Sequence, residues 1–111
     1  MRIACFISSH GYGHATRCLA VLDALSQKFQ PLEISIFSSL PNSFLEQNLN
    51  SSKFTSHNTK TDIGLIQKTP FEHDLTQTVL EWDQFLNFKI FENQKITESV
   101  KEINPDFILC D

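Results

Sequence analysis

The chain has 111 residues, of which 41% are hydrophobic, and its formal net charge is −4 at pH 7. This length suits one domain or part of one, and the acidic balance without a lysine or arginine cluster argues against nucleic acid or an anionic membrane as partner. No apolar run approaches the roughly 20 residues that span a bilayer, and none resembles a secretory signal, so we expect a cytoplasmic protein without a transmembrane segment.

The first half of the chain alternates between strand and helix patterns. Residues 2–8 are predicted to form a buried strand, and residues 14–29 a helix whose apolar side chains recur at the helical period. A proline two residues later ends that helix. Residues 32–37 alternate in the manner of a second strand, and a short helix from residue 41 to about 49 and a short strand over 53–57 follow.

The second half begins with residues 58–72, a polar stretch that we expect to be a long loop. Residues 73–103 show the longest helical pattern, with an apolar face from Leu75 to Ile103, and residues 106–110 read as a last buried strand. This order predicts an α/β fold: a Rossmann-like parallel sheet of about four strands with helices on both faces. Because the chain stops on a strand, we expect residues 1–111 to be the first part of such a domain.

The three cysteines, Cys5, Cys18 and Cys110, lie in apolar surroundings and form no C-x-x-C pair. An odd and sparse set is neither a disulfide framework nor a zinc site. We therefore expect buried thiols in a reducing compartment.

The segment from Ser8 to Arg17, SSHGYGHATR, links the first strand to the first helix. Gly11 and Gly13 relieve the steric limits on φ and let the backbone approach a ligand. The first helical N–H groups then face the cleft at the carboxyl edge of the sheet, where a phosphate, a diphosphate or a developing oxyanion is stabilised. His14 stands at this helix start, where the dipole favours the neutral imidazole, a form suited to taking a proton from a hydroxyl.

Other interpretations of the two histidines stay open. His10 and His14 have the i, i+4 spacing of zinc ligands on a helix, but the glycines between them oppose a helix and no third ligand is near, so we expect no metal. His14 could instead only cap the helix and fill the turn. For His10 a purely structural role is favoured.

Residues 7–25, ISSHGYGHATRCLAVLDAL, resemble the N-terminus of GT-B glycosyltransferases, whose first loop reads G-x-G-H before a helix. The resemblance is closer to the glycosyltransferase-like N-terminal region of arabinokinases and related bacterial proteins, where G-H-A-T-R opens that helix. Downstream, residues 62–67, DIGLIQ, are similar to their D-x-G-x-x-Q segment, and Asp74 matches an aspartate that they often carry. Residues 104–111, NPDFILCD, are similar to their P-D-x-x-x-x-D strand. The likeness thus extends along nearly the whole chain, in order.

The resemblance implies that residues 1–111 are the acceptor-side part of an enzyme that transfers a sugar from a nucleotide-sugar to an acceptor hydroxyl, without a metal or other cofactor. His14 would be the general base and Asp111 the carboxylate that orients it, unless Asp111 is only a solvated chain end. The donor-binding domain of that fold has no counterpart here, so the donor would bind through a missing C-terminal domain or a partner chain. A non-catalytic binding subunit and a regulatory sugar- or nucleotide-binding module are the alternatives.

The residues expected to contact substrate come from the first loop and from the 58–72 segment, for which an ordinary connection is the alternative. They are His10, Gly11, Tyr12, Gly13, Arg17, Asp62, Gly64 and Gln67. Arg17 stands where many family members carry proline, and a guanidinium there could bind an acidic or phosphorylated acceptor in a bidentate manner.

Overall fold

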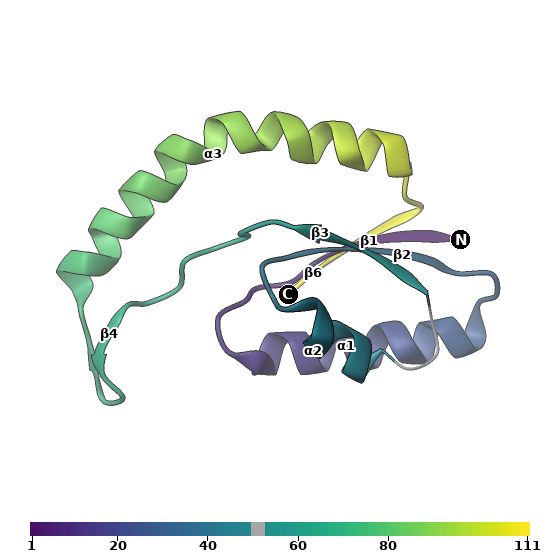
Figure 1. Cartoon of the computed structure of the whole chain (residues 1–111), viewed down its shortest axis with the longest axis horizontal. Coiled ribbons are helices and arrows are strands. Elements are labelled where there is room, and N and C mark those ends of the chain that lie inside the picture. Colours follow the sequence, from purple (N-terminus) through teal and green to yellow (C-terminus); the bar gives the residue numbers. More distant parts are fainter. Residues whose placement is uncertain (50–52) are drawn as a thin grey trace.

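The computed structural model describes the backbone of residues 1–49 and 53–111, and the side chains of these residues except 88–92. The elements in chain order are β1 (Arg2–Phe6), α1 (Tyr12–Lys28), β2 (Glu33–Ser38), α2 (Asn42–Asn48), β3 (Phe54–Asn58), β4 (Gln67–Thr69), β5 (Glu72–His73), α3 (Leu75–Ile103) and β6 (Phe107–Cys110). Figure 1 shows α1 and α2 on one side of the main sheet and α3 on the other, as the sequence predicted.

The main sheet has four parallel strands in the order β3-β2-β1-β6. The predicted α/β class and the parallel sheet are therefore confirmed. β6 pairs with β1, although about 100 residues separate them in the chain, so the carboxyl ends of these two strands lie together. Ser8 N donates to Asp111 O at 2.9 Å, and Asp111 N donates to Phe6 O at 3.1 Å. These bonds place the β1–α1 loop beside Asp111.

The apolar core lies between the sheet and the helices α1 and α2. Alternate residues of β1 and β2 point to this side, because side chains on a strand alternate between faces. Leu22 of α1 is fully buried there, and burial of such a side chain stabilises the fold by about 1.5–3 kcal/mol. The core residues are Ile3, Cys5, Ile7, Ala15, Cys18, Leu19, Leu22, Ile34, Ile36, Leu40, Leu45 and Leu49.

The opposite face of the sheet carries a row of stacked rings. Phe6, Phe37 and His57 occupy one register row of β1, β2 and β3. The Phe6 and Phe37 rings are 4.6 Å apart between centroids, and the Phe37 and His57 rings are 4.4 Å apart. α3 passes over this face with its C-terminal half and extends beyond the sheet with its N-terminal half (Figure 1).

The structure corrects two expectations in the second half of the chain. Residues 58–72 are not one loop, since β4 and β5 form a small antiparallel hairpin with Phe71 98% exposed at its turn. The apolar face of α3 is also only partly covered: Ile96 and Ile103 are half-buried, whereas Leu75 and Leu86 are exposed. The reason is that the N-terminal half of α3 has no sheet beneath it (Figure 1).

The expectation that residues 106–110 form a buried strand is wrong. β6 stands at the end of the strand order and has one neighbouring strand in the described sheet. Phe107 and Ile108 are exposed, and so is Cys110, which was expected to be a buried thiol. Cys5 and Cys18 are buried as expected.

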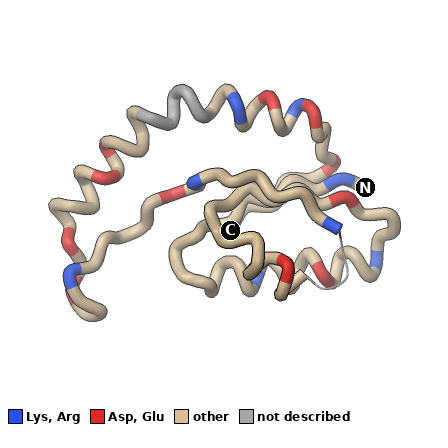
Figure 2. The backbone as a smooth tube through the Cα atoms, in the orientation of Figure 1, with Lys and Arg blue, Asp and Glu red and all other residues tan. Residues whose placement is uncertain are grey.

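Charged residues of both signs are mixed along the described backbone (Figure 2). On α3 they alternate in sign near the C-terminal end, as on a solvent-facing helix surface (Figure 2). Among the described residues, no helix is long and apolar enough to cross a bilayer.

Candidate functional site

Two segments far apart in the chain meet at the carboxyl edge of the sheet. Ser8, at the end of β1, donates from Oγ to Asp62 Oδ2 at 2.7 Å and accepts from His10 N at 3.2 Å. Thr61 Oγ1 donates to Ile7 O at 3.1 Å. These bonds hold the two predicted substrate-binding segments side by side.

His14 and Asp111 are in contact across this edge. Gly11 has a φ of 75°, which glycine adopts without a steric penalty, and it turns the chain into α1 with His14 in the first turn. His14 Nδ1 lies 3.0 Å from Asp111 Oδ1. When Nδ1 carries the proton and donates it to the carboxylate, Nε2 keeps a free lone pair. The His14 side chain is 45% exposed and lines both cavities described below.

Arg17 is the second partner of Asp111. Its Nε donates to Asp111 Oδ2 at 2.7 Å, and its Nη2 donates to Oδ1, which makes the pair bidentate. The Arg17 guanidinium first, and His14 second, hold the pKa of the Asp111 carboxyl well below its usual range. The guanidinium that we expected to bind an acidic acceptor is therefore paired within the protein. The i, i+3 spacing of His14 and Arg17 on one helix face is the signal that sequence reasoning missed.

A cavity of about 520 Å³, which we call the polar cavity, lies between the first loop and the 62–67 segment. Six of the predicted site residues line it: His10, Gly11, His14, Asp62, Gly64 and Gln67. Gly64 has a φ of 68°, and a Cβ atom at this position would overlap the His10 ring. Only glycine therefore lets the ring of His10 pack against residue 64.

A second cavity, of about 480 Å³, lies between the sheet and α3, and we call it the roofed cavity. Phe6, Ile96 and Cys110 are among its lining residues, and His14 and Asp62 line both cavities. Asp62 Oδ1 is buried and has no hydrogen-bond partner among the described residues. Protein atoms enclose this oxygen, so a ligand hydroxyl would instead reach the exposed Gln67 amide of the polar cavity.

The structure does not bring every predicted residue to these cavities. Tyr12 packs against Phe44 of α2, with the ring centroids 4.6 Å apart, and is 57% exposed. Gly13 lies within α1 with open space where its side chain would be. Both residues thus belong to the outer side of the first helical turn.

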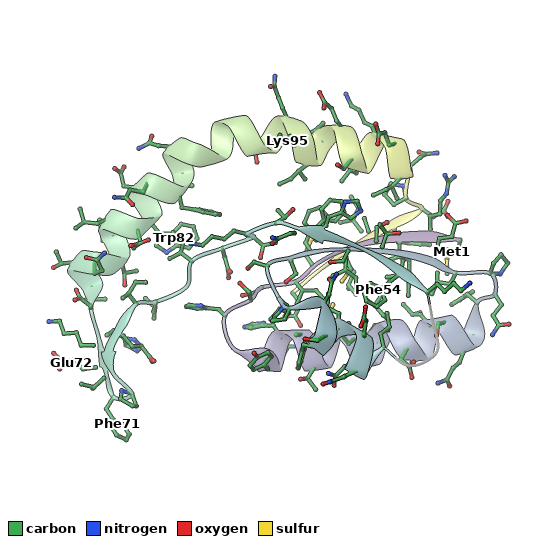
Figure 3. All side chains as sticks on the ribbon, in the orientation of Figure 1. Met1, Phe54, Phe71, Glu72, Trp82 and Lys95 are labelled. Atoms are coloured by element: carbon green, nitrogen blue, oxygen red, sulfur yellow. The ribbon has the colours of Figure 1, made fainter. Side chains whose placement is uncertain are left out.

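The first turns of α3 hold the segment that carries Asp62 and Gly64. Trp82 Nε1 donates to Gly64 O at 3.3 Å, and Ile66 N donates to Thr78 Oγ1 at 2.9 Å. Figure 3 shows Trp82 on the concave side of α3, facing the chain that leads to β4. The sequence did not predict that Thr78 and Trp82 bind this segment, because a helical pattern shows which side of a helix is apolar but not which part of the chain packs against it.

Another cavity, of about 590 Å³, opens at the opposite edge of the sheet near Arg2, Lys53 and Glu102. These residues belong to the amino ends of strands or to the end of α3. Ligands of open parallel sheets bind at the carboxyl ends of the strands, so we assign the candidate site to the polar and roofed cavities.

Within the described part of the chain, no group of three or more His, Cys, Asp or Glu side chains is gathered as metal ligands would be. Comparisons of the chain with protein-family models, with curated proteins and with solved structures find no match. The functional assignment therefore rests on the residues and their geometry.

Proposed function

We propose that this chain is the acceptor-side, N-terminal part of a GT-B glycosyltransferase, in which His14 removes the proton of an acceptor hydroxyl. The observation that supports this is the 3.0 Å contact between His14 Nδ1 and Asp111 Oδ1 at the rim of two cavities. In this proposal Nδ1–H donates to the carboxylate rather than accepting from Arg17 Nη2, which lies 3.3 Å away, and this leaves Nε2 as the base. The nucleotide-sugar donor is assigned to a second domain or a partner chain.

In this proposal the acceptor oxygen attacks the anomeric carbon of the donor while Nε2 of His14 takes its proton. The new carbon–oxygen bond forms as the bond to the nucleotide diphosphate breaks, and the leaving group departs with the electron pair. Asp111 stabilises the imidazolium that results, because the two groups are in hydrogen-bond contact.

The acceptor class follows from the polar cavity. The exposed side chain of Gln67 lines this space with an amide that both donates and accepts, next to Asp62. This pattern suits an uncharged ligand with several hydroxyl groups, such as a sugar. We place the protein in the cytoplasm, where its free cysteines stay reduced.

The test is a transfer assay on the protein in which this chain is joined to a donor-binding domain. His14→Ala is expected to lower kcat by about 10²–10⁴-fold, the usual contribution of a general base. His73→Ala, a change at an exposed histidine of β5, serves as the matched control and leaves kcat unchanged. Unchanged turnover in the His14 variant would rule out the proposed base.

A non-catalytic acceptor-binding subunit is the second candidate, and the Arg17–Asp111 pair favours it. The guanidinium already neutralises the carboxylate that a catalytic histidine would need. Titration of the chain with a panel of free sugars, followed by NMR, separates the two functions. If Asp62→Asn abolishes binding while His14→Ala affects neither binding nor turnover, the binding subunit is the correct assignment.

A further inference from the structure

Cys5 and Cys18 are in direct contact beneath the β1–α1 loop. Their Sγ atoms lie 3.1 Å apart, and the residues are 0% and 2% exposed. Cys5 points from β1 toward α1, and Cys18 lies on the face of α1 that packs on the sheet. Both sulfurs are thus held by regular elements of the core, which keeps them together.

We propose that this thiol pair is an oxidation site that closes to a disulfide when the protein meets hydrogen peroxide. One thiol attacks a peroxide oxygen and becomes a sulfenic acid, with release of one water. The other thiol then attacks the sulfenic sulfur, which forms the S–S bond and releases a second water. The two sulfurs give up two electrons, and the peroxide oxygens accept them.

Formation of the disulfide requires only a small movement of the two sulfur atoms. A disulfide has an S–S length of about 2.05 Å, so the sulfurs must approach by about 1 Å. Burial restricts the oxidant to a small molecule, and peroxide meets this condition better than a bulky disulfide such as oxidised glutathione. The two thiols share a hydrogen bond in which either sulfur can be the donor. Either thiol can attack peroxide, and the other then resolves the sulfenic acid.

The bond would enclose the whole first loop. The two cysteines are 13 positions apart, and the segment between them carries Ser8, His10, Gly11, His14 and Arg17. Oxidation would therefore tie both ends of the loop that lines the polar cavity. This inference concerns the thiols alone and does not depend on the proposed glycosyltransferase function.

The experiment maps the bond in the full chain after exposure to hydrogen peroxide. Remaining thiols are alkylated under denaturing conditions, and the chain is digested with trypsin, which cuts after Arg17 between the two cysteines. The expected product is residues 3–17 joined to residues 18–28, in a species that reducing agent separates. The oxidised protein should also gain about 10 °C in Tm, because the bond constrains the unfolded chain.

Cys110 supplies the internal reference, since it is exposed. Cys110→Ser should keep the link and the rise in Tm, whereas Cys18→Ser should lose both. If Cys110 is oxidised while the two tryptic peptides stay separate, or if Cys5 is found joined to Cys110, the proposal is wrong. The peptide mapping of the wild-type chain tests the proposal even if the Cys18→Ser variant does not fold.

Discussion

The two faces of the main sheet differ in the side chains that pack on them. The face toward α1 and α2 is a continuous apolar core in which Ile3 and Ile36 are nearly or fully buried. The face toward α3 carries the ring stack of Phe6, Phe37 and His57 and borders the roofed cavity. Aliphatic side chains thus pack one face, while stacked rings, among them the fully buried Phe37, pack the other beside a cavity.

The difference arises from how the helices meet the sheet. α1 packs along the strands, and its apolar stripe is covered from Ala15 to Leu22. α3 spans the opposite face as a curved arm, and its first turns contact the 62–67 segment through single hydrogen bonds (Figure 1). Packing therefore defines one side of the site, and a few polar contacts define the other.

The largest expected effect is on the core side. Leu22→Ala removes a fully buried side chain and should lower the free energy of unfolding by about 3 kcal/mol. Leu86→Ala, on the exposed part of α3, should change it by no more than about 0.5 kcal/mol. Urea unfolding of the two variants measures this contrast. Equal losses would show that the N-terminal half of α3 contributes as much to stability as the core beneath α1.

A smaller loss is expected at the contact between His10 and Gly64. Gly64→Ala combines a left-handed backbone with overlap of the His10 ring, and should cost about 1–2 kcal/mol. Gly13→Ala is the matched control, because its site is helical and open, and it should be neutral or stabilising by about 0.4–1 kcal/mol. The chemical shifts of the His10 ring report its displacement. An undisturbed ring in the Gly64 variant would contradict the packing described here.

The polar attachment of α3 predicts a local effect. Thr78→Val removes the oxygen that accepts from Ile66 N, and should cost about 1 kcal/mol, with faster hydrogen exchange at the Ile66 amide. Thr97→Val is the control, because Thr97 bonds within α3, to Asn93 O. If exchange at Ile66 is the same in both variants, the Thr78 hydroxyl does not hold the segment.

The smallest effect is the pH dependence of the Asp111 ion pair. The pKa of Asp111 is lowered in the folded chain, so its stabilisation is complete above the ordinary value of about 3.9 and is lost as the pH falls through the lower folded value. Arg17→Gln should raise the pKa of Asp111 toward that ordinary value, because it removes the largest cause of the shift. Carboxyl NMR measures the change, and Arg2→Gln is the control. Salt should weaken the effect, since Arg17 is mostly exposed.

Much of the fold could be predicted because hydrophobic periodicity reports the local structure directly. The strand and helix order and the parallel sheet followed from it, and the shared carboxyl edge explains why His14 and Asp111 were expected to be neighbours. The hairpin of β4 and β5 was missed because two or three residues are too few to show a period.

The contacts between helices and strands were harder to predict than the helices and strands themselves. An apolar pattern shows which face of α3 is hydrophobic, but not that Leu75 and Leu86 lie where nothing in the described chain covers them. A charge pattern likewise did not show that Arg17 reaches Asp111, because that contact depends on the pairing of β6 with β1. Both features depend on contacts between residues far apart in the chain, and the spacing of residue types along the sequence does not reveal such contacts.

The backbone bonds that join Ser8 and Asp111 to the neighbouring strands have a mechanical consequence. β1 leads into the loop and helix that carry His14, and β6 leads directly to Asp111, so the pairing of these adjacent strands brings the two side chains together. The opposite wall of the polar cavity is held by side-chain hydrogen bonds, from Ser8 to Asp62 on the sheet side and from Thr78 and Trp82 on the α3 side. One wall of the cavity is thus fixed by backbone hydrogen bonds of the sheet, whereas the other is fixed by hydrogen bonds that single side-chain substitutions can remove.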